Sequence, residues 1–391
     1  MKKIRNKALK AVSLIVCVIL ISSSFTMIDI SAENDRSYPD LALDCRSAVL
    51  MEAQTGEILY AVNEDEALPP ASVTKVMTLL LIMEAIEDKK ISYTDMVTAS
   101  ENACSMGGSQ IYLEPGEQMS VEDLIKSIVI ASANDAAVTL AEHIAGTEDA
   151  FVQMMNDKAK ELNMVNTNFE NTNGLDDTTE NHVTSAKDIA IMSRELIKYP
   201  KITEYSSIWM DTVRNGEFGL TNTNRLIRFY KGATGLKTGS TSKAGFCISA
   251  TAERDGMTLI AVIMASPSRD SRNNSAVSLL NYGFSNYTLY KNPTSVSVDI
   301  PVIKGIEQNC HTVSEEFCTV IPKNQAGNVE IKTETETFLT APVSKGQVVG
   351  KITYTANGKT LGTSKIIASE AIDTIGFFDI LVRMLARVVL K

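Results

Sequence analysis

Histidine and closely spaced cysteine are scarce in this chain of 391 residues. It has three histidines, at His143, His182 and His311, and six cysteines without a C-x-x-C pair. Zinc sites and small disulfide-bonded domains both depend on closely spaced residues of these types. The sequence therefore predicts neither a metal site nor a disulfide framework. Cys310 and Cys318 either pair across a hairpin or remain separate thiols.

Positive charge is also limited, with 37 Lys and Arg against 47 Asp and Glu and a net charge of −10. Nucleic-acid binding depends on neutralising phosphates with basic side chains, so no nucleic-acid partner is expected.

A G-x-S-x-G elbow is missing too, which argues against a Ser-His-Asp triad and for structural roles of His143 and His182. Ordinary globular composition, 44% hydrophobic and 21% charged, allows two or three domains.

The first 32 residues have the pattern of an export signal. Five basic residues precede an apolar run over 11–21 that is too short to span a bilayer comfortably, and small residues follow up to Ala32. We predict a signal peptide over 1–32, cleaved after Ala32. An uncleaved anchor would give the same topology. Val16 stands before Cys17 where a lipoprotein signal has a small residue, so lipid attachment is not expected.

Residues 33–290 combine strand and helix patterns. The strand patterns lie at the two ends of this region, at 48–52, 57–61, 245–252 and 258–265. The helical patterns lie mainly between them, at 72–86, 121–131, 135–144, 184–197 and 275–282. This order predicts a mixed α/β domain in which strands from both ends share one sheet. The helix over 72–86 is apolar on nearly every face, which predicts burial in the middle of the domain.

The pattern changes near Pro293. Short runs of Val, Ile and Thr alternate up to Ser369, which predicts a small all-β domain over 291–369. Residues 370–391 are then expected to form an amphipathic helix whose charges recur at Asp379, Arg383, Arg387 and Lys391 on one face. Its apolar surface would contain Ile372, Ile375, Phe377, Phe378, Leu381, Val382, Met384, Leu385, Val388 and Val389. We predict a membrane-anchor helix lying in the plane of the interface; a helix docked on its own domain is the alternative.

Three short motifs carry candidate chemistry. In Ser72-Val73-Thr74-Lys75, residues three apart on a helix bring a hydroxyl and an amine within hydrogen-bond reach, and burial would favour the neutral amine that a general base requires. Alone, this motif is equally compatible with a helix cap and a solvated lysine. Ser132-Ala133-Asn134 lies at a helix break and is by itself typical of a cap. Lys237-Thr238-Gly239-Ser240 leads into the strand near Gly245 and suits carboxylate binding, or else forms a plain turn.

Together, in this order, the motifs resemble the S-x-x-K, S-D-N and K-T-G set of penicillin-binding proteins and class A β-lactamases. The stretch 71–78 is most similar to the nucleophile segment of low-molecular-weight D-alanyl-D-alanine carboxypeptidases. The resemblance covers nearly all of the chain after the leader. Other similar stretches are 173–175, 182–188, 222–224, 232–241, 279–284 and 341–350.

This resemblance implies an α/β (α+β) catalytic domain of the β-lactamase/transpeptidase type, with an antiparallel sheet and helices on both sides. It also implies that Ser72 forms an acyl-enzyme with Lys75 as base, and that Ser132 and Asn134 assist proton transfer and substrate placement.

The third motif contributes the remaining implied roles. Lys237 would strengthen the local field and Thr238 would bind the terminal carboxylate of the substrate, beside Gly239 and the Ser240 N–H of the oxyanion hole. The Ser72 N–H would be the second oxyanion donor. Arg272 matches an arginine that the family uses near the carboxylate, although Arg269 lies close by.

The function implied by the resemblance is removal of the terminal D-alanine from peptidoglycan pentapeptide stems. β-Lactams would acylate the same serine, no cofactor is required, and the enzyme would work outside the cytoplasm on the outer face of the membrane. A class A β-lactamase is a poorer match, because Glu161-Leu162-Asn163 lacks the spacing of the E-x-x-L-N loop. A D,D-endopeptidase and a non-catalytic wall-binding protein remain as alternatives.

Overall fold

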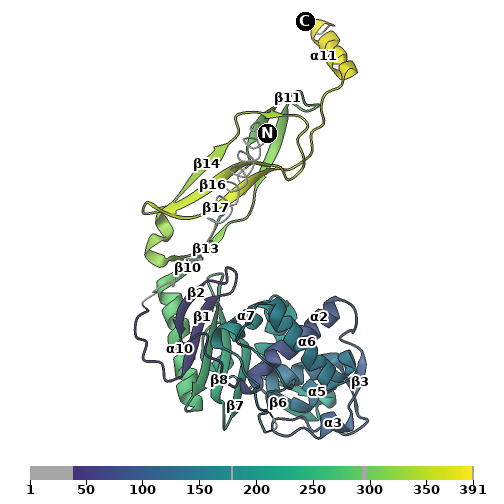
Figure 1. Ribbon diagram of the computed structural model, residues 1–391, viewed down its shortest axis with the longest axis vertical. Coiled ribbons are helices and arrows are strands. Elements are labelled where there is room, and N and C mark those ends of the chain that lie inside the picture. The colour runs from purple at the N-terminus through teal and green to yellow at the C-terminus, as the bar shows by residue number, and fades with distance from the viewer. Residues whose placement is uncertain (1–37, 178, 293–296, 390–391) are drawn as a thin grey trace, which may run out of the picture. The chain divides into compact units, whose positions relative to one another are not determined.

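A five-stranded antiparallel sheet forms the centre of the first region, which precedes the all-β region (Figure 1). The computed structural model describes residues 38–177, 179–292 and 297–389, so the expected leader over 1–32 lies outside the described residues. The strand order is β2-β1-β9-β8-β7, and Val49 of β1 pairs with Val262 of β9. The strands are β1 (Ser47–Glu52), β2 (Ile58–Val62), β7 (Ala233–Thr241), β8 (Gly245–Arg254) and β9 (Met257–Ser266). Strands from both ends of the region share one sheet, as predicted.

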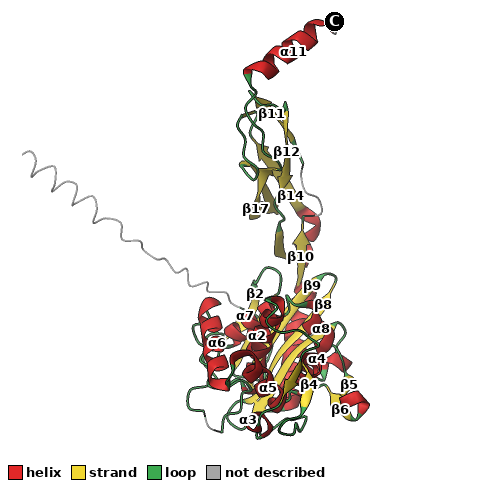
Figure 2. Ribbon diagram, turned by 90° about the vertical axis from the view of Figure 1, so that its right-hand side faces the viewer, coloured by secondary structure: helices red, strands yellow, loops and turns green. Residues whose placement is uncertain are grey.

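Helices cover both faces of this sheet, which confirms the predicted fold class (Figure 2). The long helix α10 (Arg269–Asn286) packs on β8 and β9, and α7 (Ala186–Leu196) packs on β1 and β9 from the other side. The remaining helices of this region are α2 (Lys75–Glu87), α3 (Glu101–Cys104), α4 (Val121–Lys126), α5 (Asn134–Ala145), α6 (Glu148–Glu161), α8 (Pro200–Ser206) and α9 (Leu226–Phe229). Two further antiparallel pairs are formed by β3 (Met96–Thr98) with β4 (Gln118–Ser120) and by β5 (Met210–Val213) with β6 (Phe218–Thr221).

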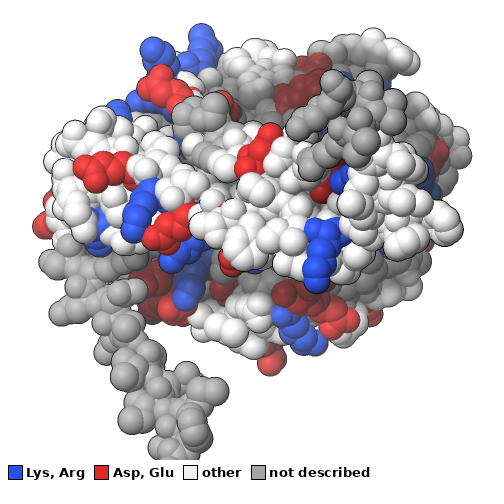
Figure 3. Space-filling view, turned by 90° about the horizontal axis from the view of Figure 1, so that it is seen from above, with Lys and Arg blue, Asp and Glu red and all other residues white. Residues whose placement is uncertain are grey.

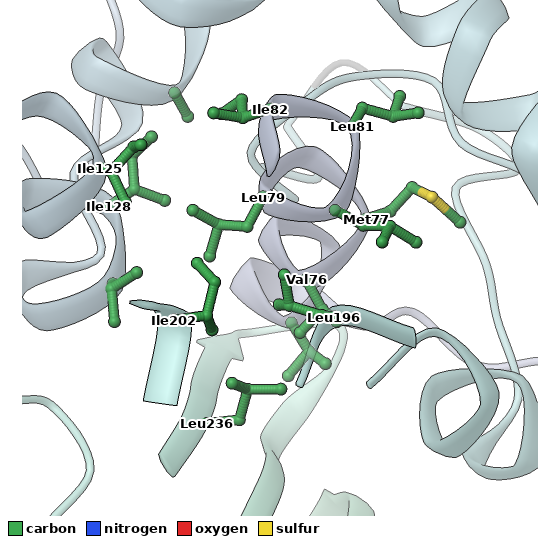
Figure 4. Packing of buried hydrophobic residues seen from close by; sticks show 14 of the residues in the cluster. Val76, Met77, Leu79, Leu81, Ile82, Ile125, Ile128, Leu196, Ile202 and Leu236 are labelled. Carbon is green, nitrogen blue, oxygen red and sulfur yellow. The ribbon is translucent and has the colours of Figure 1, made fainter. Parts of the chain in front are cut away.

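Helix α2 lies at the centre of the hydrophobic core, as its sequence predicts (Figure 4). Side chains on nearly opposite faces are buried, such as Leu79 and Leu81, and so are Val76 and Ile82. Ile128 and Leu196 from neighbouring helices are buried in the same cluster. Full burial of a side chain of this size stabilises the fold by about 1.5–3 kcal/mol, so the core fixes the position of the turn that precedes α2.

The second region is all-β, also as predicted. A six-stranded sheet has the order β14-β16-β17-β12-β11-β15, and β10 pairs with β13. The strands are β10 (Tyr287–Lys291), β11 (Asp299–Ile303), β12 (Asn309–Ser314), β13 (Cys318–Pro322), β14 (Val329–Thr335), β15 (Leu339–Thr340), β16 (Val348–Ala356) and β17 (Lys359–Ala368). Tyr354 is fully buried and stacks on Phe317 at 4.0 Å between ring centroids. Cys310 and Cys318 are free thiols.

The terminal helix α11 (Phe377–Val389) begins later than the predicted start at residue 370. The assignment of Ile372 to the apolar face of the helix is wrong, because Ile372 forms a bridge with Val343 and is buried in the core of the β domain. Ile375 also precedes the helix, and its N–H donates to the Lys304 carbonyl. Within the described residues, none of the helices combines the length and the apolar content that a bilayer crossing requires.

Candidate active site

Ser72 lies on a short 3₁₀ turn, Ala71–Thr74, that leads directly into α2. The turn is held closely on two sides by glycines. A Cβ atom on Gly174 would lie 1.9 Å from the Ala71 carbonyl oxygen, and one on Gly239 would lie 2.7 Å from the Ser72 nitrogen. Only glycine permits such an approach, so backbone packing fixes the position of the serine.

The Lys75 side chain lies next to the serine hydroxyl and is completely buried. Its Nζ atom is 2.9 Å from Ser72 Oγ, 2.5 Å from Asn134 Oδ1 and 2.7 Å from the Asn173 carbonyl oxygen. Burial lowers the pKa of Lys75 well below its usual value, and the nearby charge of Lys237 lowers it further. The amine is thus fixed in place and disposed to be neutral, as a base for Ser72 must be.

A second buried lysine lies opposite the first. Lys237 Nζ donates to Ser132 Oγ at 2.8 Å and to the Thr238 carbonyl at 2.8 Å. Burial, followed by the charge of Arg272, lowers the pKa of Lys237 to about 7. Ser132 has a left-handed backbone with φ of +65° at the junction between a π-helical turn, Ser127–Ala131, and α5. The helix break predicted at Ser132-Ala133-Asn134 is therefore present and turned toward Lys237.

The Lys237-Thr238-Gly239-Ser240 motif lies inside strand β7, not in a loop before the strand at Gly245. The prediction that this motif only precedes a strand is wrong. Gly235 and Gly239 interrupt the apolar alternation by which a strand is predicted from sequence. The strand β7 is the edge of the five-stranded sheet. An edge strand has unpaired backbone groups that an extended peptide can bind.

An open cleft of about 740 Å³ connects these groups. Of the predicted site residues, Lys75, Asn134 and Lys237 are buried beneath it, and those that line it are Ser72, Ser132, Thr238, Gly239, Ser240 and Arg272. Thr238 Oγ1 lies 2.8 Å from Thr223 Oγ1, and the buried Arg272 donates to Asn273 Oδ1 at 2.9 Å. In the described part of the chain, no three His, Cys, Asp or Glu side chains cluster as metal ligands would.

Comparison with known proteins shows what kind of protein has this site. Residues 32–268 match the family described as D-alanyl-D-alanine carboxypeptidase, and residues 284–374 match the domain described as penicillin-binding protein 5, C-terminal domain. The chain belongs to the D-alanyl-D-alanine carboxypeptidase family. It is 43% identical over 352 residues to D-alanyl-D-alanine carboxypeptidase DacF of Bacillus subtilis, covering 88% of this chain and 90% of that relative. It is 35% identical to DacC of Escherichia coli, covering 86% of each chain.

Solved structures agree with this assignment. Penicillin-binding protein 5 from Haemophilus influenzae is similar with a TM-score of 0.75 and 32% identity, covering 86% of this chain and 99% of that one. Penicillin-binding protein 6B from Escherichia coli is similar with a TM-score of 0.71 and 32% identity, covering 85% and 97%. The chain is therefore a low-molecular-weight penicillin-binding protein and a serine-type D-alanyl-D-alanine carboxypeptidase, a hydrolase of peptidoglycan peptides.

Sequence reasoning missed several residues that support the site. The Asn173 carbonyl and the Thr223 hydroxyl contact Lys75 and Thr238, respectively. Both lie in stretches quoted for the family resemblance, 173–175 and 222–224, so the signal for them was available. Asp176 accepts a hydrogen bond from Thr241 at the end of β7, and its carbonyl accepts one from Lys243 Nζ at 2.6 Å.

His182 was expected to be structural, and it supports the turn that contains Ser72. Its Nδ1 atom accepts from the Glu170 N–H at 2.9 Å, and Nε2 lies 2.7 Å from Thr74 Oγ1. Thr74 Oγ1 in turn donates to the Ala71 carbonyl at 2.8 Å. Nε2 therefore carries the proton, and burial lowers the pKa of His182 to about 4. The neutral ring links a distant loop to the turn that contains Ser72.

Proposed function

We propose that Ser72 is the nucleophile of this carboxypeptidase and that Lys75 is its general base. The observation that carries the proposal is the 2.9 Å contact between Lys75 Nζ and Ser72 Oγ, made by an amine whose pKa is lowered by burial. Ser72 Oγ transfers its proton to Lys75 Nζ and attacks the carbonyl carbon of the penultimate D-alanine. The N–H groups of Ser72 and Ser240 stabilise the oxyanion, since Gly239 brings strand β7 close to the nucleophile turn.

The leaving group departs on the side of Ser132. The Ser132 hydroxyl, hydrogen-bonded to Lys237, passes a proton to the amide nitrogen as the C–N bond breaks, and D-alanine leaves. The proton that Lys75 took from Ser72 replaces the one that Ser132 gave, so Lys75 is neutral again. Water then attacks the ester carbon and gives a proton to Lys75, which returns it to Ser72 Oγ as the shortened peptide is released. Asn134 positions both Lys75 and the substrate amide, and Thr238 with Arg272 binds the terminal carboxylate.

β-Lactams are proposed to acylate the same serine. The solved structures of penicillin-binding protein D2 from Listeria monocytogenes in ampicillin-bound and cefotaxime-bound forms are 32% identical to this chain over 63% of its length. A lactam carbonyl placed over Ser72 would meet the same base and oxyanion donors, which supports transfer of that behaviour to this chain.

We also propose that the protein is exported and held on the outer face of the membrane by α11. Phe377 and Phe378, at the start of α11, are 74% and 78% exposed, and Val382 is 64% exposed. Exposed aromatic and aliphatic side chains beside Asp379 and Arg383 suit a helix lying in the interface. If deletion of residues 370–391 leaves the fraction of protein that sediments with membranes unchanged, the anchor is refuted.

The β domain would hold the catalytic domain away from the bilayer. Deletion of 293–369 should then reduce activity on intact wall more than on soluble peptide.

The first test of the catalytic proposal measures D-alanine release from a peptide ending in D-Ala-D-Ala, together with the mass of the protein after exposure to penicillin. Release and a covalent adduct are expected for the wild type, and both should be lost in Ser72→Ala. An adduct without release would point to a binding protein or an endopeptidase. Rapid penicillin turnover without peptide cleavage would point to a β-lactamase.

A further inference from the structure

Four arginines line the cleft that contains Ser72: Arg225, Arg228, Arg269 and Arg272. The first two come from the short helix α9 and its N-terminal boundary, and the other two from the first turns of α10. These segments are far apart in the chain, so the fold, and not a basic stretch of sequence, gathers the four side chains. Arg272 is buried, whereas the other three are exposed to the cleft.

The four side chains form a concentration of positive charge without a salt bridge among the described residues, and Asp270 is the carboxylate whose charge acts on Arg272. Ion pairs in the described part of the chain use other basic residues, such as Arg46 with Glu66 and Arg214 with Glu117, and none includes these four. Burial lowers the pKa of Arg272 to about 10, and the charges of Arg269 and Arg225 act in the same direction. The protein is acidic overall, and on the face drawn in Figure 3 the basic side chains are interspersed with acidic ones. Such a cluster lowers its repulsion by binding anions.

Aromatic rings hold one of these arginines in place. The Arg228 guanidinium lies 5.6 Å from the ring centroid of Trp209 and 5.6 Å from that of Phe229. Both rings also line the cleft. Cation–π contacts of this kind reduce the freedom of the guanidinium and leave its N–H groups available. The wall is therefore apolar along the rings and cationic at its end, which suits an aliphatic chain that ends in a carboxylate.

The proposed reaction uses only part of this charge. One terminal carboxylate requires Thr238 and the buried Arg272, which leaves three exposed guanidinium groups in the lining of the same cleft without an assigned ligand. We infer that Arg225, Arg228 and Arg269 form a second anion subsite. It selects substrates whose leaving D-amino acid carries a further carboxylate on its side chain. The inference rests on the proposed function, because it assumes that the leaving residue lies beside Thr238 and Arg272.

The experiment compares three N-acylated peptides that differ only in the last residue, D-alanine, D-glutamate or D-glutamine, after the same D-alanine. D-Glutamine has nearly the shape of D-glutamate without the charge. At low salt the wild type should have a kcat/KM about tenfold higher for the D-glutamate peptide than for the D-glutamine peptide, a preference of about 1.4 kcal/mol. The ratio should fall as salt rises, since the groups are exposed. A wild-type ratio near 1 would overturn the inference.

A triple variant, Arg225→Gln with Arg228→Gln and Arg269→Gln, should bring the ratio close to 1. The matched control is Lys231→Gln, which removes an exposed positive charge just after α9 but outside the cleft lining, and which should keep the ratio. A triple variant that retains the wild-type ratio would show that other groups bind the side chain and would contradict the subsite.

Failure of the proposed function gives a different result. In that case the D-Ala-D-Ala peptide itself is not cleaved and penicillin adds no mass to the protein. The subsite is then tested without turnover, by calorimetric binding of the D-glutamate and D-glutamine peptides to Ser72→Ala. Tighter binding of the D-glutamate peptide by about tenfold, lost in the triple variant, supports the subsite. Equal binding of the two peptides refutes it.

Discussion

The catalytic domain and the β domain bury polar side chains in opposite ways. In the described part of the β domain, the buried polar residues are Thr312 and Ser364, whose hydroxyls have simple local partners. The catalytic domain buries two lysines and an arginine around one cleft. Burying a cation costs several kcal/mol unless close partners compensate. Packing of apolar residues accounts for the β domain, whereas the catalytic domain keeps buried cations at the cleft where we propose that the reaction takes place.

The strongest test of this comparison removes a costly group. Lys75→Met keeps an unbranched side chain of similar length in the buried site and removes the proposed base next to Ser72. We expect kcat/KM for D-alanine release to fall about 10³-fold, while thermal unfolding remains cooperative. Lys231→Met, on the surface, is the matched control and should act like the wild type. A fall of less than tenfold in Lys75→Met would mean that another group takes the proton.

The converse test removes an apolar group from the β domain. Tyr354 is fully buried and stacks on Phe317, so Tyr354→Ala should destabilise this domain by about 3–5 kcal/mol. Hydrolysis of a soluble peptide should stay within about twofold of the wild type. Denaturant unfolding, followed with a probe in each domain, measures the loss of β-domain stability. The peptide assay measures the rate of hydrolysis. The exposed Tyr112 in the catalytic domain provides a control, Tyr112→Ala. If Tyr354→Ala lost activity on the soluble peptide together with β-domain stability, catalysis would not be independent of the β domain.

Stability of the nucleophile turn should depend on pH through His182. Its pKa is about 4 in the folded protein, against about 6.5 when unfolded, so the neutral ring is favoured by folding. The contribution is complete above pH 6.5 and is lost as pH falls toward 4, by up to about 3 kcal/mol. In His182→Gln the free energy of unfolding should decrease less steeply between pH 6.5 and pH 4. Identical slopes in both proteins would contradict the assignment.

The smallest expected effect concerns the rate at alkaline pH. Lys237 has a pKa of about 7, and its proposed role of strengthening the field beside Ser132 requires the positive charge, so kcat/KM should fall about tenfold for each pH unit above 7. In Lys237→Arg the side chain stays charged, and this decrease should move to higher pH. An unchanged alkaline decrease in that variant would assign the titration to another group.

The sequence was informative where the pattern is periodic or the motif is short. It predicted the shared sheet, the buried helix α2, the all-β domain and the proximity of Ser72 to Lys75. It did not predict that Lys237 lies within a strand, because two glycines hide the alternation. Ile372 was misplaced because an apolar residue beside a helix pattern reads the same whether it packs in a neighbouring core or on the helix.

The resemblance pointed to stretches that support the site, but the individual contacts could not be predicted for a different reason. The contact of Lys75 with the Asn173 carbonyl uses a backbone group, which every residue has, and the link from His182 to Thr74 joins loops that no local pattern relates. The arginines around the cleft are similarly scattered, and only the fold makes a cluster of them.

The close approach of Gly239 to the Ser72 nitrogen also has a consequence for the newly made chain. A polypeptide is produced from its N-terminus, and Ser72 emerges long before strand β7. Strand β1 must also wait for β9 before it has its second neighbour in the sheet. A half-finished chain therefore has the proposed nucleophile, Ser72, without the proposed oxyanion donor at Ser240. We therefore expect no hydrolytic activity from the growing polypeptide until strands β7 and β9 have joined the sheet.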